Sequence, residues 1–248
     1  MHSELYHPFL IAEDNASPQR LVMLDSDMIV MRNMDELMEL DLPEEWIAAV
    51  HVCACNPRRL AHYPKDWYVT HTPRTTAHSQ YDSRIPENCA YTPLLHPTGH
   101  TQPSSIEPSS PRPYTLLNSG AVVLTPSATV ARSIVDFLHT SPLVPTFSFP
   151  DQDLLAAFFK GRWKPLPWVY NAFKTLRTIH KGLWRDEEVR CVHYILPDKP
   201  WKKRVRGDDV VDETTETHKW WWEHFDKLVD GIGEDSDTRM LLLANVDN

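Results

Sequence analysis

The chain has 248 residues, of which 42% are hydrophobic and 24% charged, and this balance is typical of one folded domain rather than of a disordered or fibrous chain. Its 25 lysines and arginines against 34 aspartates and glutamates give a net charge of -9, which disfavours binding to nucleic acid or to an anionic membrane surface. No glycine-rich phosphate-binding loop of the GxGxxG or GxxxxGKS type occurs. An anionic ligand therefore needs a cation to hold it.

The chain contains four cysteines, at Cys53, Cys55, Cys89 and Cys191. They are too few for a disulfide scaffold and lack the paired CxxC spacing of zinc sites, so we interpret them as reduced thiols of the core. The first 18 residues have no apolar run long enough for a signal peptide. No window approaches the ~18 consecutive apolar residues of a membrane span. We expect a cytoplasmic protein, unless a missing N-terminal segment carries a membrane anchor of the Golgi type.

The first half of the chain predicts two buried strands. Residues 20–30, RLVMLDSDMIV, form an apolar run with two aspartates, which predicts a strand that ends in an acidic turn. Asn33 is a capping residue for a short helix over 33–40, and 46–53 read as a second buried strand. From about residue 56 to 113 the chain is rich in Pro, Ser and His without periodicity, which predicts a long irregular insertion that is partly disordered.

The second half predicts alternating strands and helices, the last of which carries three consecutive tryptophans that we expect to pack on the body of the domain. The expected elements are strands at 114–125 and 190–195 and helices at 127–140, 151–160 and 217–230. This alternation favours a mostly parallel sheet covered on both faces, with ligands at the carboxyl ends of its strands. We therefore expect one α/β domain over residues 1–232, followed by a flexible tail over residues 233–248.

Asp25 and Asp27 are the first candidate ligand-binding residues. In an extended chain an i, i+2 pair projects to the same side, so both carboxylates can bind one divalent cation. The alternative is a solvated turn in which one aspartate caps the next helix. The pair alone does not choose between these two interpretations.

The segment RCVHYILPDKPWKK places His193 at the end of a strand and Lys199 six residues later in a proline-stiffened turn. An imidazole beside two carboxylates suits Mn²⁺ better than Mg²⁺, which prefers oxygen strongly. Lys199 is a suitable point charge for a phosphate. The alternative is a core histidine with a surface lysine. Together with the acidic pair, the metal site of Asp25, Asp27 and His193 is the favoured interpretation.

Two further polar segments are suited to hydroxyl-rich ligands, because carboxylates accept hydrogen bonds and side-chain amides both donate and accept them. One is Asn118-Ser119-Gly120 in the strand predicted over 114–125, and the other begins at Asp151-Gln152. Their alternative role is the capping of turns and helices, which by itself explains Asp151.

In chain order these segments resemble glycosyltransferase family 8, the group of glycogenin and galactinol synthase, and the pattern is of fungal type. The matching segments are RLVMLDSDMIV, LLNSGAVVLTPS, FPDQDLL, LPWVYN and VHYILPDKPW. The resemblance implies the GT-A fold, a Rossmann-like α/β sandwich. It also implies an Mn²⁺-dependent enzyme that transfers a hexose from a UDP-sugar to an acceptor with retention of configuration.

The resemblance also assigns roles to residues. Asp25, Asp27 and His193 match the metal ligands, Asp27 also lies near the ribose and diphosphate, and Lys199 matches the diphosphate contact. The residues that match the donor-sugar pocket or its surroundings are Asn118, Ser119, Gly120, Asp151 and Gln152. The acceptor, which is a carbohydrate, a polyol or a protein, is not readable from the sequence, and a homodimer stays open.

Retention of configuration has two routes. Either Asp151 or Gln152 attacks the sugar covalently, or the acceptor enters on the face of the leaving group with the departing phosphate as its base. The sequence leaves both routes open. We favour the front-face route, since no catalytic nucleophile is evident.

Three departures from the family pattern lead to further expectations. Only 24 residues precede Asp25, so we expect the chain to lack part of the N-terminal region that binds uridine. Residues 68–84 interrupt an otherwise continuous segment, and we interpret them as a translated intron. Leu196 stands where glycogenin commonly has a glycine near the diphosphate.

Two alternative functions follow. The first is a non-catalytic remnant or binding protein of the same fold that has lost uridine binding. The second is a DxD phosphohydrolase, which we disfavour because that class needs a threonine at the position of Ile29.

Overall fold

The computed structural model describes most of the chain. The described residues are 19–56, 60–61, 63–64, 67, 88–94, 101–205, 214–234 and 236–246. The expectations for residues 1–18 and for the 68–84 segment lie outside these ranges.

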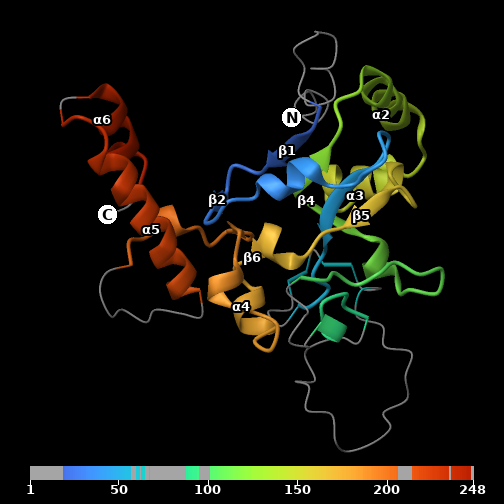
Figure 1. Ribbon diagram of the computed structural model, residues 1–248, viewed down its shortest axis with the longest axis horizontal. Coiled ribbons are helices and arrows are strands. Elements are labelled where there is room, and N and C mark those ends of the chain that lie inside the picture. Colours follow the sequence, from blue (N-terminus) through green and yellow to red (C-terminus); the bar gives the residue numbers. More distant parts are fainter. Residues whose placement is uncertain are drawn as a thin grey trace, which may run out of the picture.

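The described residues contain seven strands in two sheets, one of order β1-β4-β3-β5 and one of order β2-β7-β6 (Figure 1). The strands are β1 (Leu21–Leu24), β2 (Met28–Val30), β3 (Ile47–His51), β4 (Leu117–Leu124), β5 (Trp163–Pro165), β6 (Ala172–Phe173) and β7 (Cys191–His193). β4 runs antiparallel to both β1 and β3, and β2 runs antiparallel to β7. Only the pairs β3–β5 and β6–β7 are parallel among these residues.

The expected mostly parallel sheet is therefore wrong for the part of the chain described. An apolar run shows that a strand is buried, as β3 is at all five positions, but it carries no information on direction. Parallel neighbours need a crossover connection, usually a helix. The link from β3 to β4 contains short 3₁₀-helices and no α-helix in its described parts, and β4 returns antiparallel.

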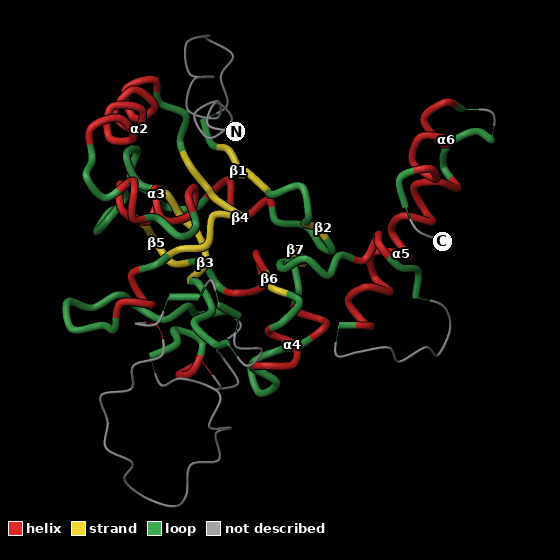
Figure 2. The backbone as a smooth tube through the Cα atoms, turned by 180° about the vertical axis from the view of Figure 1, so that it is seen from behind, coloured by secondary structure: helices red, strands yellow, loops and turns green. Residues whose placement is uncertain are grey.

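The α-helices are α2 (Ala128–Thr140), α3 (Pro150–Phe158), α4 (Leu176–Ile179), α5 (Thr215–Asp230) and α6 (Asp237–Ala244). The short 3₁₀-helices are η3 (Asp35–Glu39), η5 (Thr92–Leu94), η6 (Arg112–Thr115), η7 (Val144–Thr146), η8 (Trp168–Asn171), η9 (Asp186–Glu188) and η10 (Pro200–Lys202). Figure 2 shows α2 and α3 together beside β4 and β5, and α5 and α6 at the opposite end of the molecule.

The predicted helix after residue 126 is confirmed. The side chain of Ser127 accepts a hydrogen bond from the backbone N–H of Val130 at 3.3 Å, which satisfies one of the free N–H groups of the first turn of α2. Val130 and Ile134 lie on the buried face of the helix. The predicted strands and helices at 46–53, 114–125, 151–160, 190–195 and 217–230 are likewise present, with shifted ends.

Both faces of the larger sheet are buried. Ile47 and Ala49 of β3 pack into a cluster with Ile134 of α2 and with residues of α3. Ala48 and Val50, which point the other way because side chains alternate along a strand, pack into a second cluster around η8, β6 and β7. This two-sided burial explains why β3 reads as a continuous apolar run.

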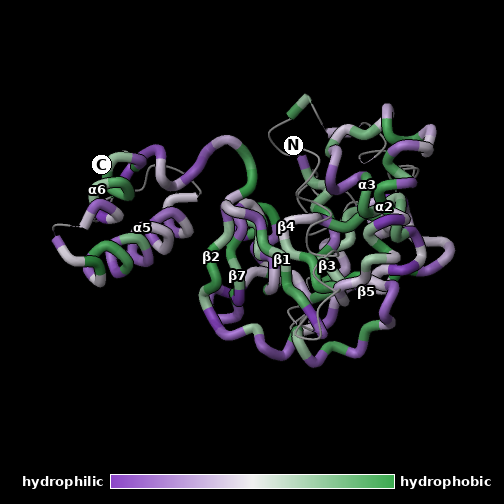
Figure 3. The backbone as a smooth tube through the Cα atoms, turned by 90° about the horizontal axis from the view of Figure 1, so that it is seen from above, coloured by the Kyte–Doolittle hydropathy of each residue, from purple (hydrophilic) through white to green (hydrophobic). Residues whose placement is uncertain are grey.

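Part of the C-terminal region packs against α5. Residues 233–248, predicted to be a flexible tail, contain helix α6, and Leu242 packs against Trp222 and Phe225 of α5. Figure 3 shows α5 and α6 standing to one side of the sheets. The indole N–H of Trp222 donates to the carbonyl oxygen of Pro200 at 3.0 Å, which attaches α5 to η10. The tryptophans therefore serve packing, as expected.

Among the described residues, no helix combines the length and the apolar character needed to cross a membrane.

Candidate active site

The acidic turn of residues 25–27 joins β1 to β2 and so links the two sheets. The backbone N–H of Asp25 donates to the carbonyl oxygen of Gly120 in β4 at 2.8 Å. The backbone N–H of Tyr194, directly after β7, donates to the carbonyl oxygen of Asp27 at 2.9 Å. Neighbouring strands therefore hold the turn at both ends and fix where its carboxylates lie. The predicted strand that ends in an acidic turn is present as β1, and a second strand, β2, which the sequence analysis did not separate, follows the turn.

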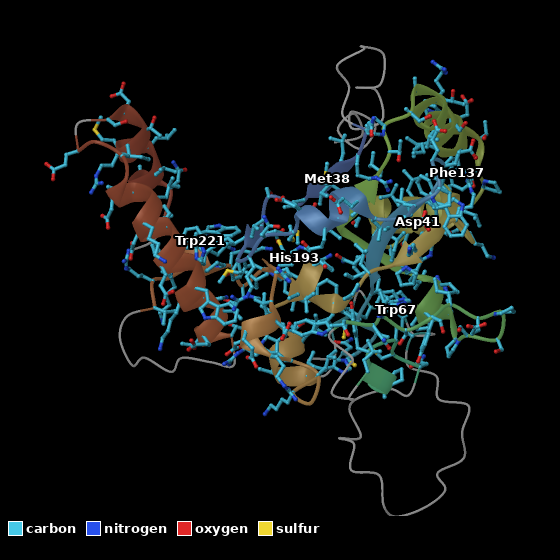
Figure 4. All side chains as sticks on the ribbon, viewed as in Figure 1. Met38, Asp41, Trp67, Phe137, His193 and Trp221 are labelled. Atoms are coloured by element: carbon cyan, nitrogen blue, oxygen red, sulfur yellow. The ribbon has the colours of Figure 1, made fainter. Side chains whose placement is uncertain are left out.

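The structure brings the three predicted metal ligands together. His193, which is 4% exposed, ends β7 near the centre of the molecule (Figure 4). Its Nε2 lies 3.1 Å from Oδ1 of Asp27 and 3.7 Å from Oδ2 of Asp25. One ligand atom from each residue lies within 4.8 Å of the other two. The histidine is buried, as in the alternative of a core histidine, but its Nε2 faces both carboxylates.

Lys199 joins the same cluster. Its Nζ donates to Oδ2 of Asp27 at 2.5 Å and to the carbonyl oxygen of Tyr194 at 2.6 Å. An ammonium group has three protons, so one donor remains for a ligand. The ammonium also lies 5.9 Å from the ring centre of Trp201, which is within cation–π range.

The two carboxyl groups have opposite pKa shifts. Burial raises the pKa of Asp25, and the charges of Asp27 and Asp151 add to this effect against the opposing charge of His193. Burial also disfavours the charged form of Asp27, but its close contacts with His193 and Lys199 outweigh this effect and lower the pKa of Asp27 to about 2. Asp27 therefore stays ionised throughout the physiological range, while Asp25 is the carboxyl group that a bound cation would relieve most.

A chain of amide side chains leads from the backbone of β4 to His193. The backbone N–H of Gly120 lies 3.0 Å from Oδ1 of Asn118, and since a backbone N–H can only donate, this Asn118 atom is an oxygen. The same oxygen accepts from Nδ2 of Asn171 at 2.7 Å. Oδ1 of Asn171 therefore faces Nδ1 of His193, at 2.8 Å.

This chain fixes the tautomer of His193. Because an amide oxygen only accepts, Nδ1 of His193 carries a proton and donates to Asn171. In the neutral ring the lone pair is then on Nε2, the atom that faces Asp25 and Asp27. Metal-binding histidines are typically held in this way, by a hydrogen bond from the other ring nitrogen.

The predicted sugar-pocket residues lie along the same network. Asn118 donates through Nδ2 to Oε1 of Gln152 at 2.9 Å, and the hydroxyl of Ser119 donates to Oδ2 of Asp151 at 2.6 Å. Asp151 and Gln152 occupy the first turn of α3. The backbone N–H groups before this helix are bound by Asp153 instead, at 2.8 and 2.9 Å. Asp153 thus fixes the segment that leads into α3, and Asp151 faces the strand.

Gly120 is required by the close approach of His193. A Cβ atom added at residue 120 would lie 2.6 Å from Nδ1 of His193 and would also overlap its Cε1 atom. Real Cβ contacts essentially never come this close, so any side chain here displaces the imidazole. The small residue in the Asn118-Ser119-Gly120 segment therefore serves the geometry of the candidate metal site.

Asn171 is a site residue that the sequence analysis did not single out. It is fully buried at the end of η8 and holds the imidazole of His193. The available signal was its place in the LPWVYN segment, where a polar residue ends an otherwise apolar and aromatic stretch.

The donor set fits a divalent cation. Two carboxylates supply oxygen, one imidazole supplies nitrogen from a fixed tautomer, and the three atoms lie close enough for shared coordination. One negative charge of the pair is already balanced by Lys199. The cluster is thus a candidate metal centre with a cationic side chain at its rim.

A model of the family described as Glycosyl transferase family 8 matches residues 3–204. The chain belongs to this family. The relatives that it resembles include galactinol synthase 1 of Ajuga reptans, 30% identical over 221 residues, and galactinol synthase 4 of Arabidopsis thaliana, 29% identical over 239 residues. These alignments cover 88% and 92% of this chain but 57% and 62% of the relatives. The chain thus spans little more than half the length of these relatives.

Solved structures with similar folds include two glycosyltransferases. The galactosyltransferase LgtC, solved with donor and acceptor sugar analogs, has a TM-score of 0.49 and 14% identity over 89% of this chain and 65% of its own. The glycosyltransferase GlyE of Streptococcus pneumoniae TIGR4 has a TM-score of 0.48 and 16% identity over 90% of this chain and 47% of its own.

Membership of Glycosyl transferase family 8 confirms the resemblance drawn from the five segments, including its galactinol-synthase branch. The expected α/β class is confirmed as well, because strands and helices are mixed along the described residues. The GT-A architecture stays what the resemblance implies. The fungal type stays a prediction.

Proposed function

We propose that this chain is a retaining, Mn²⁺-dependent glycosyltransferase that transfers a hexose from a UDP-sugar to an acceptor. Family membership supports the class of reaction. The observation that carries the proposal is the convergence of Asp25, Asp27 and His193 within 4.8 Å beside Lys199. These residues come from separate parts of the chain and together make a site for a metal-bound diphosphate.

Each residue of the proposed metal site has its own role. Asp25, Asp27 and Nε2 of His193 are the proposed ligands, and Asn171 positions the imidazole through Nδ1. When bound, the cation acts as a Lewis acid on the diphosphate and stabilises UDP as the leaving group. The remaining donor of Lys199 binds a phosphate oxygen and offsets charge that develops there.

The sugar pocket is proposed to lie at the start of α3. Asn118 orients Gln152, and Ser119 orients Asp151, so both α3 side chains are held by hydrogen bonds toward β4. A neutral amide such as that of Gln152 is a weak nucleophile, and the Asp151 carboxylate is already engaged by a hydroxyl. We therefore propose the front-face route, in which Asp151 and Gln152 contact the donor sugar and the departing phosphate accepts the acceptor's proton.

The first experiment measures UDP binding by calorimetry with and without Mn²⁺. We expect micromolar binding that requires the metal, because the diphosphate is held largely through it. The Asp25→Asn substitution removes one ligand charge and should weaken UDP binding at least tenfold. Glu44→Gln, which removes an exposed carboxylate outside the cluster, is the matched control and should bind as the unchanged chain does.

The second experiment measures UDP release from UDP-galactose and UDP-glucose with polyol and saccharide acceptors. Release that depends on Mn²⁺ and is lost in Asp25→Asn supports the transferase. The absence of micromolar UDP binding in the presence of Mn²⁺ points to the non-catalytic alternative, which has lost uridine binding. UDP binding that does not depend on Mn²⁺ and is unchanged in Asp25→Asn overturns the proposed metal site.

A further inference from the structure

Three cysteines and one histidine converge in the core, apart from the candidate active site. The Sγ atoms of Cys53, Cys55 and Cys89 lie 3.6, 3.3 and 3.7 Å from Nε2 of His180. All four atoms lie within 4.8 Å of one another. The four residues are between 0% and 8% exposed, and the cysteines form no disulfide. The expected reduced core thiols are thus present, but three of them face a single nitrogen.

The four residues come from three separate parts of the chain. Cys53 and Cys55 follow β3, Cys89 lies in the described segment 88–94, and His180 follows α4 directly. The CxC pair and the two distant residues do not form a recognisable zinc spacing. Only the folded chain brings them together.

Hydrogen bonds to His180 alone do not account for the three sulfur atoms around its Nε2 atom. The Nε2 atom of an imidazole has either one proton or one lone pair, so it makes one good hydrogen bond. Three sulfur atoms around His180 therefore cannot all be satisfied by it. A cation between the four atoms would satisfy every one of them.

The distances agree with tetrahedral coordination. With Zn–S bonds of ~2.3 Å and Zn–N bonds of ~2.0–2.1 Å, the sulfur-to-nitrogen edge of a tetrahedral zinc site is about 3.6 Å. The three measured distances from Sγ to Nε2, 3.6, 3.3 and 3.7 Å, cluster around this value. Three thiolates with one imidazole are among the usual ligand sets of structural zinc.

Thiolates rather than thiols ligate zinc, so binding of the cation would release the thiol protons of the cluster to solvent.

We propose that Cys53, Cys55, Cys89 and His180 form a structural zinc site. Its four ligands are all supplied by the protein and all buried, so it has no open position for a substrate. The site would fasten the segment around Cys89 to the end of β3 and to α4. This inference does not depend on the proposed transferase activity.

Packed aromatic rings connect the proposed zinc site to the candidate active site. The ring of Tyr91 packs at 5.7 Å from His180 and at 6.3 Å from Phe173, and Phe173 packs at 5.9 Å from His193. Zinc at the thiol cluster would therefore support the aromatic side chains against which His193 rests.

Metal analysis of the full chain, purified from a zinc-supplied culture without chelator, is the direct test. We expect one zinc per chain to survive gel filtration and to be released by a mercurial reagent that blocks thiols. Cys55→Ser and Cys89→Ser should lose the zinc. Cys191→Ser, which alters the buried cysteine outside the cluster, and Asp25→Asn, which alters the other metal centre, should retain it.

Cobalt substitution gives a readout on the unaltered chain, should the cysteine variants not fold. Co²⁺ in place of zinc should give a thiolate charge-transfer band in the near ultraviolet and strong visible bands typical of tetrahedral coordination. A chain without bound zinc and without these bands, or one in which two of Cys53, Cys55 and Cys89 are shown by mass spectrometry to form a disulfide, overturns the proposal. Zinc retained equally by Cys55→Ser and Cys89→Ser also overturns it.

Discussion

Gly120 shows how a single hydrogen atom in place of a side chain sets the geometry of the site. In Gly120→Ala the added methyl group would overlap the imidazole of His193, which has no free space to enter because it is 4% exposed. We expect a loss of about 1–3 kcal/mol in the free energy of unfolding, as for other overpacked positions. A displaced imidazole should also weaken metal binding, by ~10–100-fold when a histidine loses its support.

Urea unfolding and Mn²⁺ titration of Gly120→Ala measure these two effects. The control is Gly233→Ala, where an added Cβ has no neighbour within 4 Å. It should leave metal binding unchanged. Unaltered Mn²⁺ affinity in Gly120→Ala would show that His193 does not ligate the metal.

Leu196 carries backbone strain at the position where the resemblance to glycogenin implies a glycine. Its φ of 72° lies in the left-handed region, which costs a residue with a Cβ atom ~1–2 kcal/mol. Leu196→Gly removes the side chain and relieves this strain. Leu196→Ala loses nearly the same packing but keeps the strain. After the larger entropy of glycine in the unfolded chain is counted, we expect the glycine variant to be more stable than the alanine variant by up to about 1 kcal/mol. Urea unfolding of the pair measures the difference, and a more stable alanine variant contradicts the expectation.

At the scale of elements, the joint between α4 and η9 depends on one ion pair. Arg177 donates from Nε and Nη2 to both carboxylate oxygens of Asp186, each at 3.0 Å, and the indole of Trp184 donates to the same carboxylate at 2.6 Å. The hydrogen bond from Arg177 lowers the pKa of Asp186 against the effect of burial. The ionised form is therefore favoured by folding.

Since the pKa of Asp186 is lower in the folded than in the unfolded chain, its stabilisation is complete above the ordinary aspartate pKa of ~3.9 and is lost as pH falls through the folded value. Asp186→Asn should lower the free energy of unfolding by about 0.5–1 kcal/mol at neutral pH, the range of a part-exposed pair. This difference should shrink when unfolding is measured below pH ~4. The neighbouring exposed carboxylate in Glu187→Gln is the control, and an Asp186→Asn difference that does not change with pH contradicts the ion pair.

The elements also show what the amino-acid pattern can and cannot predict. Burial and periodicity predict β3, β4 and α2 correctly, because long apolar runs and a capping Ser127 are local signals. The same signals do not give strand direction, so the antiparallel place of β4 is missed. Strands as short as β6, with two residues, leave no periodicity to read.

At the scale of the whole molecule, the two metal-binding clusters differ in how far they could be predicted. Asp25, Asp27 and His193 were predicted together because each stands in a segment with its own motif. The cluster of Cys53, Cys55, Cys89 and His180 was not, since its ligands share no sequence spacing and meet only through the packing of β3, α4 and the segment around Cys89. Convergence that depends on tertiary packing leaves no local signal.

The candidate metal centre also links the two sheets, which leads to a prediction for the stability of the whole chain. Asp25 follows β1 of the larger sheet, whereas Asp27 precedes β2 and His193 ends β7 of the smaller sheet. A cation that binds all three residues binds the folded chain and not the unfolded one, in which His193 is far from the two aspartates. At a free concentration 100 times its dissociation constant it should raise the free energy of unfolding by ~2.7 kcal/mol.

Urea unfolding in Mn²⁺, in Mg²⁺ and without added metal measures this gain, with one zinc per chain supplied beforehand and no excess, so that the thiol cluster is filled and the second site is left for the added metal. Because the imidazole of His193 favours Mn²⁺ over Mg²⁺, we expect Mn²⁺ to stabilise at lower concentration. Asp25→Asn should abolish most of the gain and Glu44→Gln none of it. Burial and the neighbouring charges raise the pKa of Asp25, so protons should compete with the metal, and the gain should fall on acidification sooner than for an ordinary aspartate. A gain that is equal for both metals and persists in Asp25→Asn would place the bound cation elsewhere in the molecule.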